Sequence, residues 1–156
     1  MAIVKRADRR HYMLVGSQWE QIGEGFTEFS ESKNAVSFQR RYIHEITRRT
    51  DVTGYAPVID YEFEVYTDNP VIEALRAIAD GELVGEAAKA DVLTVDLFDE
   101  GETSGVYRAY RRRYSVIPDE SGKGTDALVY SGTMKAVGDL ETGTFVPSSG
   151  VWTPAV

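Results

Sequence analysis

The chain has 156 residues, of which 42% are hydrophobic and 27% charged, ordinary values for one globular domain large enough to bury a core. It contains no cysteine, which excludes disulfides and thiol chemistry, and no apolar run approaches the roughly 18 residues that a membrane span requires. The net charge of −8 is uneven, because residues 51–105 hold 14 acidic and 2 basic side chains. So acidic a segment disfavours direct binding to nucleic acid, which needs cations facing the phosphates.

The first part of the chain predicts extended structure. Residues 19–29, WEQIGEGFTEF, indicate short strands broken at Gly23 and Gly25. Residues 35–50, AVSFQRRYIHEITRRT, fit a helical or a strand period, and their β-branched and aromatic content favours one strand. Residues 51–57, DVTGYAP, predict a loop.

The next segment, VIDYEFEVYTDNP, alternates along its length. Ile59, Tyr61, Phe63 and Val65 fall on one face of a strand, and three carboxylates fall on the other face: Asp60, Glu62 and Glu64. Adjacent like charges repel, so this acidic face predicts a role other than stability.

One helix is predicted at about residues 69–80. Asn69 is a good N-cap and Pro70 a good first helical residue, and Gly81 is suited to end the helix in a left-handed conformation. The residues between them form one apolar stripe, which must pack on a sheet because a helix of three turns is unstable alone in water.

Strands resume after the helix. They are expected at 91–100, 106–117 and 127–137, with one or two more within 141–154, separated by a turn at 101–105 and a loop at 118–125. The predicted fold class is mainly β (α+β): a single domain, residues 1–156, with a β-sandwich or barrel and one flanking helix.

No residue set predicts catalysis, a metal site or a cofactor. His11 and His44 are far apart and lack a ligand spacing, and no acid sits in an apolar context that would raise its pKa. The arginine cluster could bind phosphates, but solvated strand positions or ion pairs with a neighbouring acidic strand are the more economical interpretation: Arg108, Arg111, Arg112 and Arg113. We therefore expect a protein that is not an enzyme.

Three stretches, WEQIGEGFTEFSESKNA, GYAPVIDYEFEVYTDNPVIEALRAIADG and YSGTMKAVGDLETGTFVP, resemble the major tail (tail tube) proteins of long-tailed bacteriophages and related phage-tail-like particles. The resemblance implies a virion tail protein that is assembled in the host cytoplasm without a membrane. Six copies would form a ring, and rings would stack into a tube through which DNA passes without specific binding. Its partners would be further copies of itself, the tape-measure protein, the tail-initiator or baseplate proteins and the tail terminator.

This resemblance assigns a role to the acidic strand. Asp60, Glu62 and Glu64 would line the lumen, where negative charge repels DNA phosphates and water screens the carboxylates over roughly 8 Å. Alternatively, the same face lies outside the tube with the arginines of residues 108–113 as its cross-strand partners.

Four segments are expected to contact neighbouring subunits and to be partly disordered in the free subunit: 1–15, 47–57, 99–105 and 147–156. Basic residues in the first two could pair with the acidic middle segment of an adjacent ring: Lys5, Arg6, Arg9, Arg10, Arg48 and Arg49. The arginines at 108 and 111–113 are candidates for intersubunit contacts as well. The alternative function is a small-ligand or carbohydrate-binding β-sandwich or barrel that uses Tyr107, Tyr110 and Tyr114.

Overall fold

The computed structural model describes residues 1–155, and it is mainly β with a single α-helix in that range. The helix is α1 (Pro70–Asp80), and short 3₁₀ turns lie at η1 (Arg6–Asp8) and η2 (Gly85–Ala88). The strands are β1 (Arg9–Val15), β2 (Gln18–Ile22), β3 (Phe26–Ser32), β4 (Ala35–Arg40), β5 (Arg49–Tyr55), β6 (Val58–Glu64), β7 (Lys89–Glu100), β8 (Tyr107–Ser121), β9 (Val129–Ala136), β10 (Glu141–Val146) and β11 (Val151–Pro154). No helix in the described part of the chain combines the length and apolar character needed to cross a membrane.

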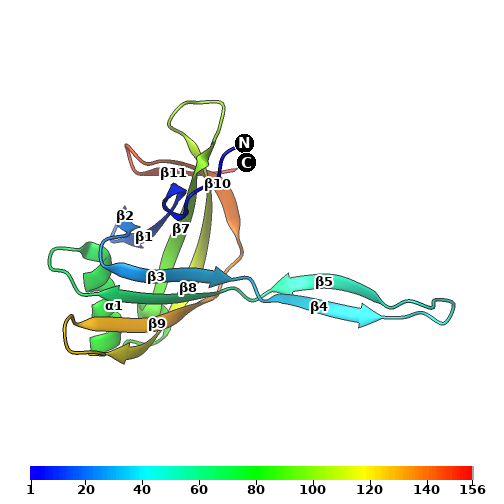
Figure 1. Ribbon diagram of the computed structural model, residues 1–156, viewed down its shortest axis with the longest axis horizontal. Helices are drawn as coiled ribbons and strands as arrows, with labels where there is room; N and C mark the ends of the chain where they lie inside the picture. The colour runs from blue at the N-terminus through cyan, green and yellow to red at the C-terminus, as the bar shows by residue number, and fades with distance from the viewer. Residues whose placement is uncertain (156) are drawn as a thin grey trace.

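Nine strands form one antiparallel sheet in the order β2-β1-β7-β8-β9-β6-β3, with β10 added to β8 and β11 to β10. The sheet curls into a half-barrel (Figure 1). Its two sides approach each other at β1 and β3, where the rings of His11 and Phe29 lie 4.6 Å apart and the Arg6 guanidinium donates to the Phe29 carbonyl oxygen. We call this junction the seam. The expected mainly-β fold with one flanking helix is confirmed.

Two apolar clusters occupy opposite faces of the sheet. On the inner face, Ile59, Tyr61 and Phe63 of β6 pack with residues of β1, β7, β8 and β9 beneath α1. On the other face, Tyr12, Leu93 and Phe145 belong to a smaller cluster near β10 and β11. Adjacent residues such as Tyr12 and Met13 enter different clusters because side chains alternate across a strand.

The helix begins as the sequence predicts. The Asn69 side-chain oxygen accepts hydrogen bonds from the amides of Val71 and Ile72, at 3.1 and 3.2 Å, and Pro70 is the first helical residue. Its apolar stripe is buried against the sheet: Val71, Ile72, Leu75 and Ile78. The expected left-handed Gly81 is wrong: its φ is −86°, and Glu82 adopts the positive φ instead.

Several expected boundaries are also wrong. Residues 35–50 are not one strand, because the chain reverses at 41–48. Residues 51–57 are not a loop throughout, because residues 51–55 belong to the returning strand β5. Similarly, β8 extends to Ser121 into the expected loop, since its end pairs with β9. The expected breaks at Gly23 and Gly25 are confirmed, and Gly25 needs its positive φ of 88° because a side chain there would meet the Glu64 carbonyl.

The β4–β5 hairpin stands apart from the sheet (Figure 1). It projects from the half-barrel as an arm, residues 35–55, and none of its residues is buried. Its root is fastened by the Asn34 side chain, which donates to the Ala56 carbonyl oxygen at 3.1 Å. Phe38, Ile43 and Val52 are among its exposed apolar side chains. An isolated two-stranded hairpin is marginally stable in water, so this arm is built to be supported by something else.

Candidate functional site

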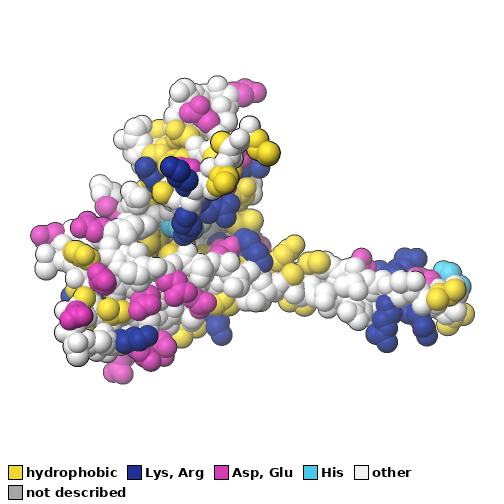
Figure 2. Space-filling model, in the orientation of Figure 1, with side chains coloured by type: hydrophobic (Ala, Val, Ile, Leu, Met, Phe, Trp, Pro, Cys, Tyr) yellow, Lys and Arg dark blue, Asp and Glu magenta, His cyan; other side chains and the backbone are white. Residues whose placement is uncertain are grey.

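The three carboxylates of β6 lie on the outer face of the half-barrel. Ile59, Tyr61 and Phe63 point into the core, so alternation places Asp60, Glu62 and Glu64 outward. Sequence reasoning missed Glu28, which stands directly opposite Glu62 on β3. The four residues form the acidic face: Glu28, Asp60, Glu62 and Glu64. Figure 2 shows acidic side chains gathered over this part of the body.

The acidic face has no internal compensation. Within residues 1–155 none of its four carboxylates belongs to an ion pair, and polar Ser131 and Thr133 of β9 stand beside Glu62 and Asp60. Like charges opposite each other in a sheet are destabilising. This face therefore lowers the stability of the isolated chain rather than adding to it.

The second candidate surface is the tip of the arm. Arg40, Arg41, Arg48 and Arg49 gather there with exposed Tyr42, Ile43 and Ile46, and Figure 2 shows the dark blue cluster at the end of the projection. The sequence predicted contacts for Arg48 and Arg49 but not for Arg40 and Arg41, because no local pattern marks the chain reversal between the two pairs. Cationic and apolar groups are thus presented together at the point farthest from the core.

Side chains order this tip without burying it. The Arg40 guanidinium lies 5.6 Å from the ring centre of Phe38 and 5.8 Å from the ring centre of Tyr42. The Arg49 guanidinium also lies 5.6 Å from the ring centre of Tyr42. Arg49 also pairs with Glu45 at 2.7 Å, and Arg40 pairs with Asp51. The hydrogen bonds of Arg40 to Tyr42 and Asp51 raise the pKa of its guanidinium, which stays charged.

The N-terminal basic residues are divided between two roles. Arg9 belongs to β1 and binds buried Asp96 of β7 through two bonds of 2.6 and 3.0 Å, so its guanidinium is committed within its own chain. Arg6 is committed to the seam, whereas Lys5 is exposed and Arg10 is half-buried. The predicted arm at 1–15 is therefore too long: residues 9–15 form β1, which pairs with β7 through residues 9–13 and with β2 through residues 11–15.

The arginines of β8 are not partners of the acidic strand in this chain. Strand β8 pairs with β7, β9 and β10, whereas β6 lies beyond β9. Arg108 pairs with Asp99 at 3.3 Å, and Arg111 and Arg113 share Asp91 at 3.4 and 3.3 Å. The interpretation as ion pairs to a neighbouring acidic strand is correct, and that strand is β7. Arg112 points to the opposite face of the sheet from its neighbours.

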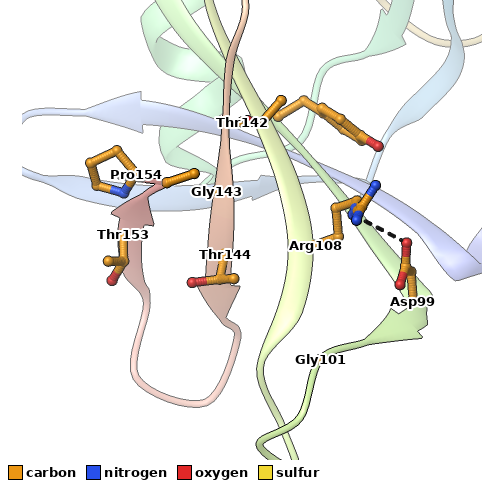
Figure 3. Close-up of a pocket in the computed structure, with 10 residues that line it drawn as sticks. Asp99, Gly101, Arg108, Thr142, Gly143, Thr144, Thr153 and Pro154 are labelled. Carbon is orange, nitrogen blue, oxygen red and sulfur yellow. Dashed lines mark ion pairs between the residues drawn. The ribbon is translucent and has the colours of Figure 1, made fainter.

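One of the larger cavities contains no catalytic arrangement of side chains. It measures about 510 Å³ and lies between β8, β10 and β11, beside the Arg108–Asp99 ion pair (Figure 3). Thr142, Thr144 and Thr153 contribute hydroxyls, and Gly143 lets the strands approach, because a Cβ there would meet the Thr153 carbonyl and the Trp152 ring. The cavity holds no base beside a nucleophile, and within residues 1–155 no three acidic or histidine side chains gather as metal ligands.

The three tyrosines proposed for carbohydrate binding do not share one surface, because Tyr110 and Tyr114 line the same cavity whereas Tyr107 lies on the opposite face of β8. Tyr107 packs against the cluster near β10 and β11, while Tyr114 lies in the inner core and donates from its hydroxyl to Glu31 at 2.8 Å. Burial and the hydrogen bond to Glu31 raise the pKa of Tyr114.

No protein-family model and no curated protein matches the sequence. Among solved structures, the chain is similar to one in the "Cryo-EM structure of the anti-feeding prophage (AFP) baseplate, 6-fold symmetrised". The TM-score is 0.53 at 13% sequence identity, and the alignment covers 91% of this chain and 95% of that chain. At this level of identity the two chains share a fold, including nearly the whole length of both.

Proposed function

We propose that the protein is a structural subunit of a phage tail or phage-tail-like particle. Its copies form hexameric rings that stack into a hollow tube, which carries DNA to the host when the particle is a phage. The observation that supports this most directly is the pairing of a well-packed half-barrel with an arm that buries none of its own residues. The fold shared with a prophage baseplate chain from a six-fold symmetrised structure supports the same conclusion.

Lateral association has a structural basis in the open sheet. Strands β2 and β3 are edges of the nine-stranded sheet, and unpaired edges offer backbone donors and acceptors to another chain. Edge-to-edge pairing of six copies would close a larger barrel and leave the acidic face of β3 and β6 continuous around it. We assign that face to the lumen, where it repels DNA phosphates, and we assign no enzymatic activity or cofactor to the subunit.

Contacts between rings are assigned to the arm and to the chain ends. The arm tip carries four arginines and exposed apolar side chains, and it is complementary to the acidic middle segment of another copy. Residues 1–5 remain available for a neighbour, as do the turns at 99–105 and 147–150. The remaining partners are the tape-measure protein, the initiator or baseplate proteins and the terminator.

Electron microscopy of the purified protein at high concentration tests the proposal. Rings or tubes are the expected result, and monomers at every concentration and salt tested would contradict it. A chain shortened by residues 1–4 should fold, as judged by circular dichroism, yet form shorter tubes or none. Deletion must stop before Arg6 and Arg9, because these residues hold the seam and compensate buried Asp96.

The lumen assignment has its own test. We replace Asp60, Glu62 and Glu64 by lysine in the phage and compare it with a control in which Asp119, Glu120 and Asp126, all exposed outside the acidic face, become lysine. Tails should assemble in both, but DNA delivery should fall only in the first, because cations on the wall bind phosphates and release counterions. Raising salt should partly restore ejection in vitro. Absent tails, or abundant tails with normal delivery, would refute the lumen position.

A further inference from the structure

A second cavity, separate from the one in Figure 3, opens at the seam between β1 and β3. It measures about 300 Å³ and is lined by side chains of the inner sheet face. We call it the seam pocket and define it by its polar residues: Arg9, His11, Glu31, Lys33, Arg112 and Tyr114. Phe29, Ile59 and Tyr110 supply apolar and aromatic walls. The pocket thus combines charge with a surface that suits a flat or apolar group.

The charges of the seam pocket do not balance. Arg9 is matched by Asp96, and Lys33 is matched by Glu31. His11 is neutral near pH 7, because burial and the nearby Arg6 and Arg9 guanidinium groups lower its pKa to about 4. Arg112 has no carboxylate partner within residues 1–155, so one positive charge is left over.

Arg112 is the unmatched cation that lines the seam pocket. Its Nε atom is buried and has no hydrogen-bond partner in the described part of the chain. Buried donors are rarely left unpaired, because a donor that loses its hydrogen bonds to water and gains none in the protein raises the free energy of the folded state. The same side chain also borders the root of the arm, beside Tyr55 and Pro57. Arg112 therefore lines two separate cavities, the seam pocket and one at the root of the arm.

The free edge of β3 favours a polypeptide as the ligand of the seam pocket. Phe29 and Glu31 of β3 line the pocket, and β3 is hydrogen-bonded to β6 on one side only. Arg6 covers the edge at the Phe29 carbonyl. A chain segment that enters beside β3 can use the remaining backbone groups while it places a side chain in the pocket.

A segment of this chain has the complementary chemistry. Phe98, near the end of β7, is 52% exposed, and Glu102 in the turn that follows is exposed and belongs to no ion pair among the described residues. The turn is ordered by its own hydrogen bonds, including Gly105 N to the Glu100 carboxylate at 2.8 Å. It therefore offers a ring and a carboxylate on a preformed loop.

We propose that the seam pocket receives the β7–β8 turn of a second copy, with Glu102 against Arg112 and Phe98 against the aromatic wall. This inference deepens the proposed self-assembly and rests on it. The inference names the contact by which one subunit recognises the next. This contact can be measured between two subunits in solution, before any ring has formed.

Disulfide trapping tests the contact, because the chain has no cysteine of its own. One protein carries Thr103→Cys in the turn, and another carries Leu140→Cys at the pocket rim, where Leu140 is 43% exposed. When the two are mixed and oxidised, heterodimers should exceed both homodimers several-fold. Lys123→Cys, on a distant exposed loop, replaces Leu140→Cys in the control and should give no excess.

Substitutions on both sides of the contact identify the interaction. Arg112→Gln should abolish the heterodimer excess, and Glu102→Gln in the Thr103→Cys protein should do the same from an exposed position that cannot disturb the core. A labelled peptide of residues 97–103 should bind the unmodified protein at least tenfold more tightly than it binds the Arg112→Gln protein. A peptide of residues 119–126, which is acidic but lacks an aromatic residue, should bind weakly to both.

The outcomes separate this inference from the proposed function. Rings or tubes without heterodimer excess would overturn the pocket assignment and leave the tail role standing. Heterodimer excess that depends on Arg112 and Glu102, without rings at any concentration, would support the contact and contradict the ring. Equal binding of both peptides would show that the pocket accepts any acidic segment, which also overturns the assignment to the turn.

Discussion

The half-barrel and the arm are both made of antiparallel strands, but only one of them buries its side chains. In the half-barrel, alternation places Ile59, Tyr61 and Phe63 beneath α1, each less than 4% exposed. In the arm, Phe38 of β4 and Val52 of β5 are both exposed, because no third strand or helix covers either face of the hairpin. The comparison teaches that strand pairing alone sets the shape of a segment, whereas burial decides whether the segment contributes to the stability of the free chain.

The largest expected effect lies in the half-barrel. Leu75→Ala should lower the free energy of unfolding by about 2–5 kcal/mol, because it removes a side chain that is 1% exposed and leaves a cavity between α1 and the sheet. Denaturant melting measures the loss. The same substitution at Leu128, which is 47% exposed, should cost less than about 1 kcal/mol. Similar losses at both positions would mean that α1 is not packed as described.

The second effect is a pH dependence that the seam should show and the arm should lack. The pKa of His11 is about 4 in the folded chain, against an ordinary value of 6.5, so the unfolded chain binds the proton more readily between these values. Unfolding free energy should therefore fall by about 3 kcal/mol as the pH drops from 7 to 4.

A histidine in the arm gives the matched control for this pH dependence. His11→Gln should flatten the stability profile above about pH 4.5, whereas His44→Gln should leave it unchanged, since the His44 side chain is 73% exposed at the arm tip. Thermal melting across this pH range decides. Identical profiles for the wild-type and His11→Gln proteins would show that His11 does not resist protonation in the folded state.

A smaller effect concerns the ion pair between β1 and β7. Arg9→Met should cost about 1–3 kcal/mol, since Asp96 is only 3% exposed and would lose its partner. The half-exposed position of Arg9 keeps the loss at the lower end of that range. Arg48→Met on the arm removes an equal charge and should leave stability within ±0.5 kcal/mol. Equal stability of the two variants would mean that the ion pair of Arg9 with Asp96 does not stabilise the fold.

The substitution with the smallest expected effect on stability gives the sharpest test of the difference between the arm and the half-barrel. Phe38→Ser in the arm should change the unfolding free energy by less than about 0.5 kcal/mol, because no core contact is lost. It should nevertheless prevent tube growth, as seen by electron microscopy. Phe29→Ser, in contrast, alters a partly buried ring at the seam and should destabilise the subunit itself. Normal tubes from the Phe38→Ser protein would remove this residue from the interface.

Local signals in the sequence were sufficient for the core. Asn69 and Pro70 predicted the start of α1, and the alternation of Ile59, Tyr61 and Phe63 predicted the inner face of β6. The arm was missed because its reversal at 41–48 contains no glycine, proline or asparagine to mark a turn. A strand and its returning partner look like one long strand when the turn between them has no signature.

The candidate sites show the same difference between features with a local signal in the sequence and features without one. The acidic face followed from period-two alternation, and the same rule applied to β8 would have separated Arg112 from Arg111 and Arg113. The partners of these arginines did not follow, since Arg9 and Asp96 are 87 positions apart and meet only through the pairing of β1 with β7. Glu28 was missed for the same reason, because its place opposite Glu62 depends on a strand register that no local pattern contains.

The stacking of Arg40 between Phe38 and Tyr42 has a consequence for the kinetics of assembly. A segment that is disordered before docking must lose its conformational entropy during association, and that loss lowers affinity. The stacked side chains and the Arg40–Asp51 pair restrict the arm to one extended shape beforehand. In the proposed assembly, preorganisation of this kind would let a subunit join a growing end in a single encounter, with the arm already in the conformation that its neighbour would receive.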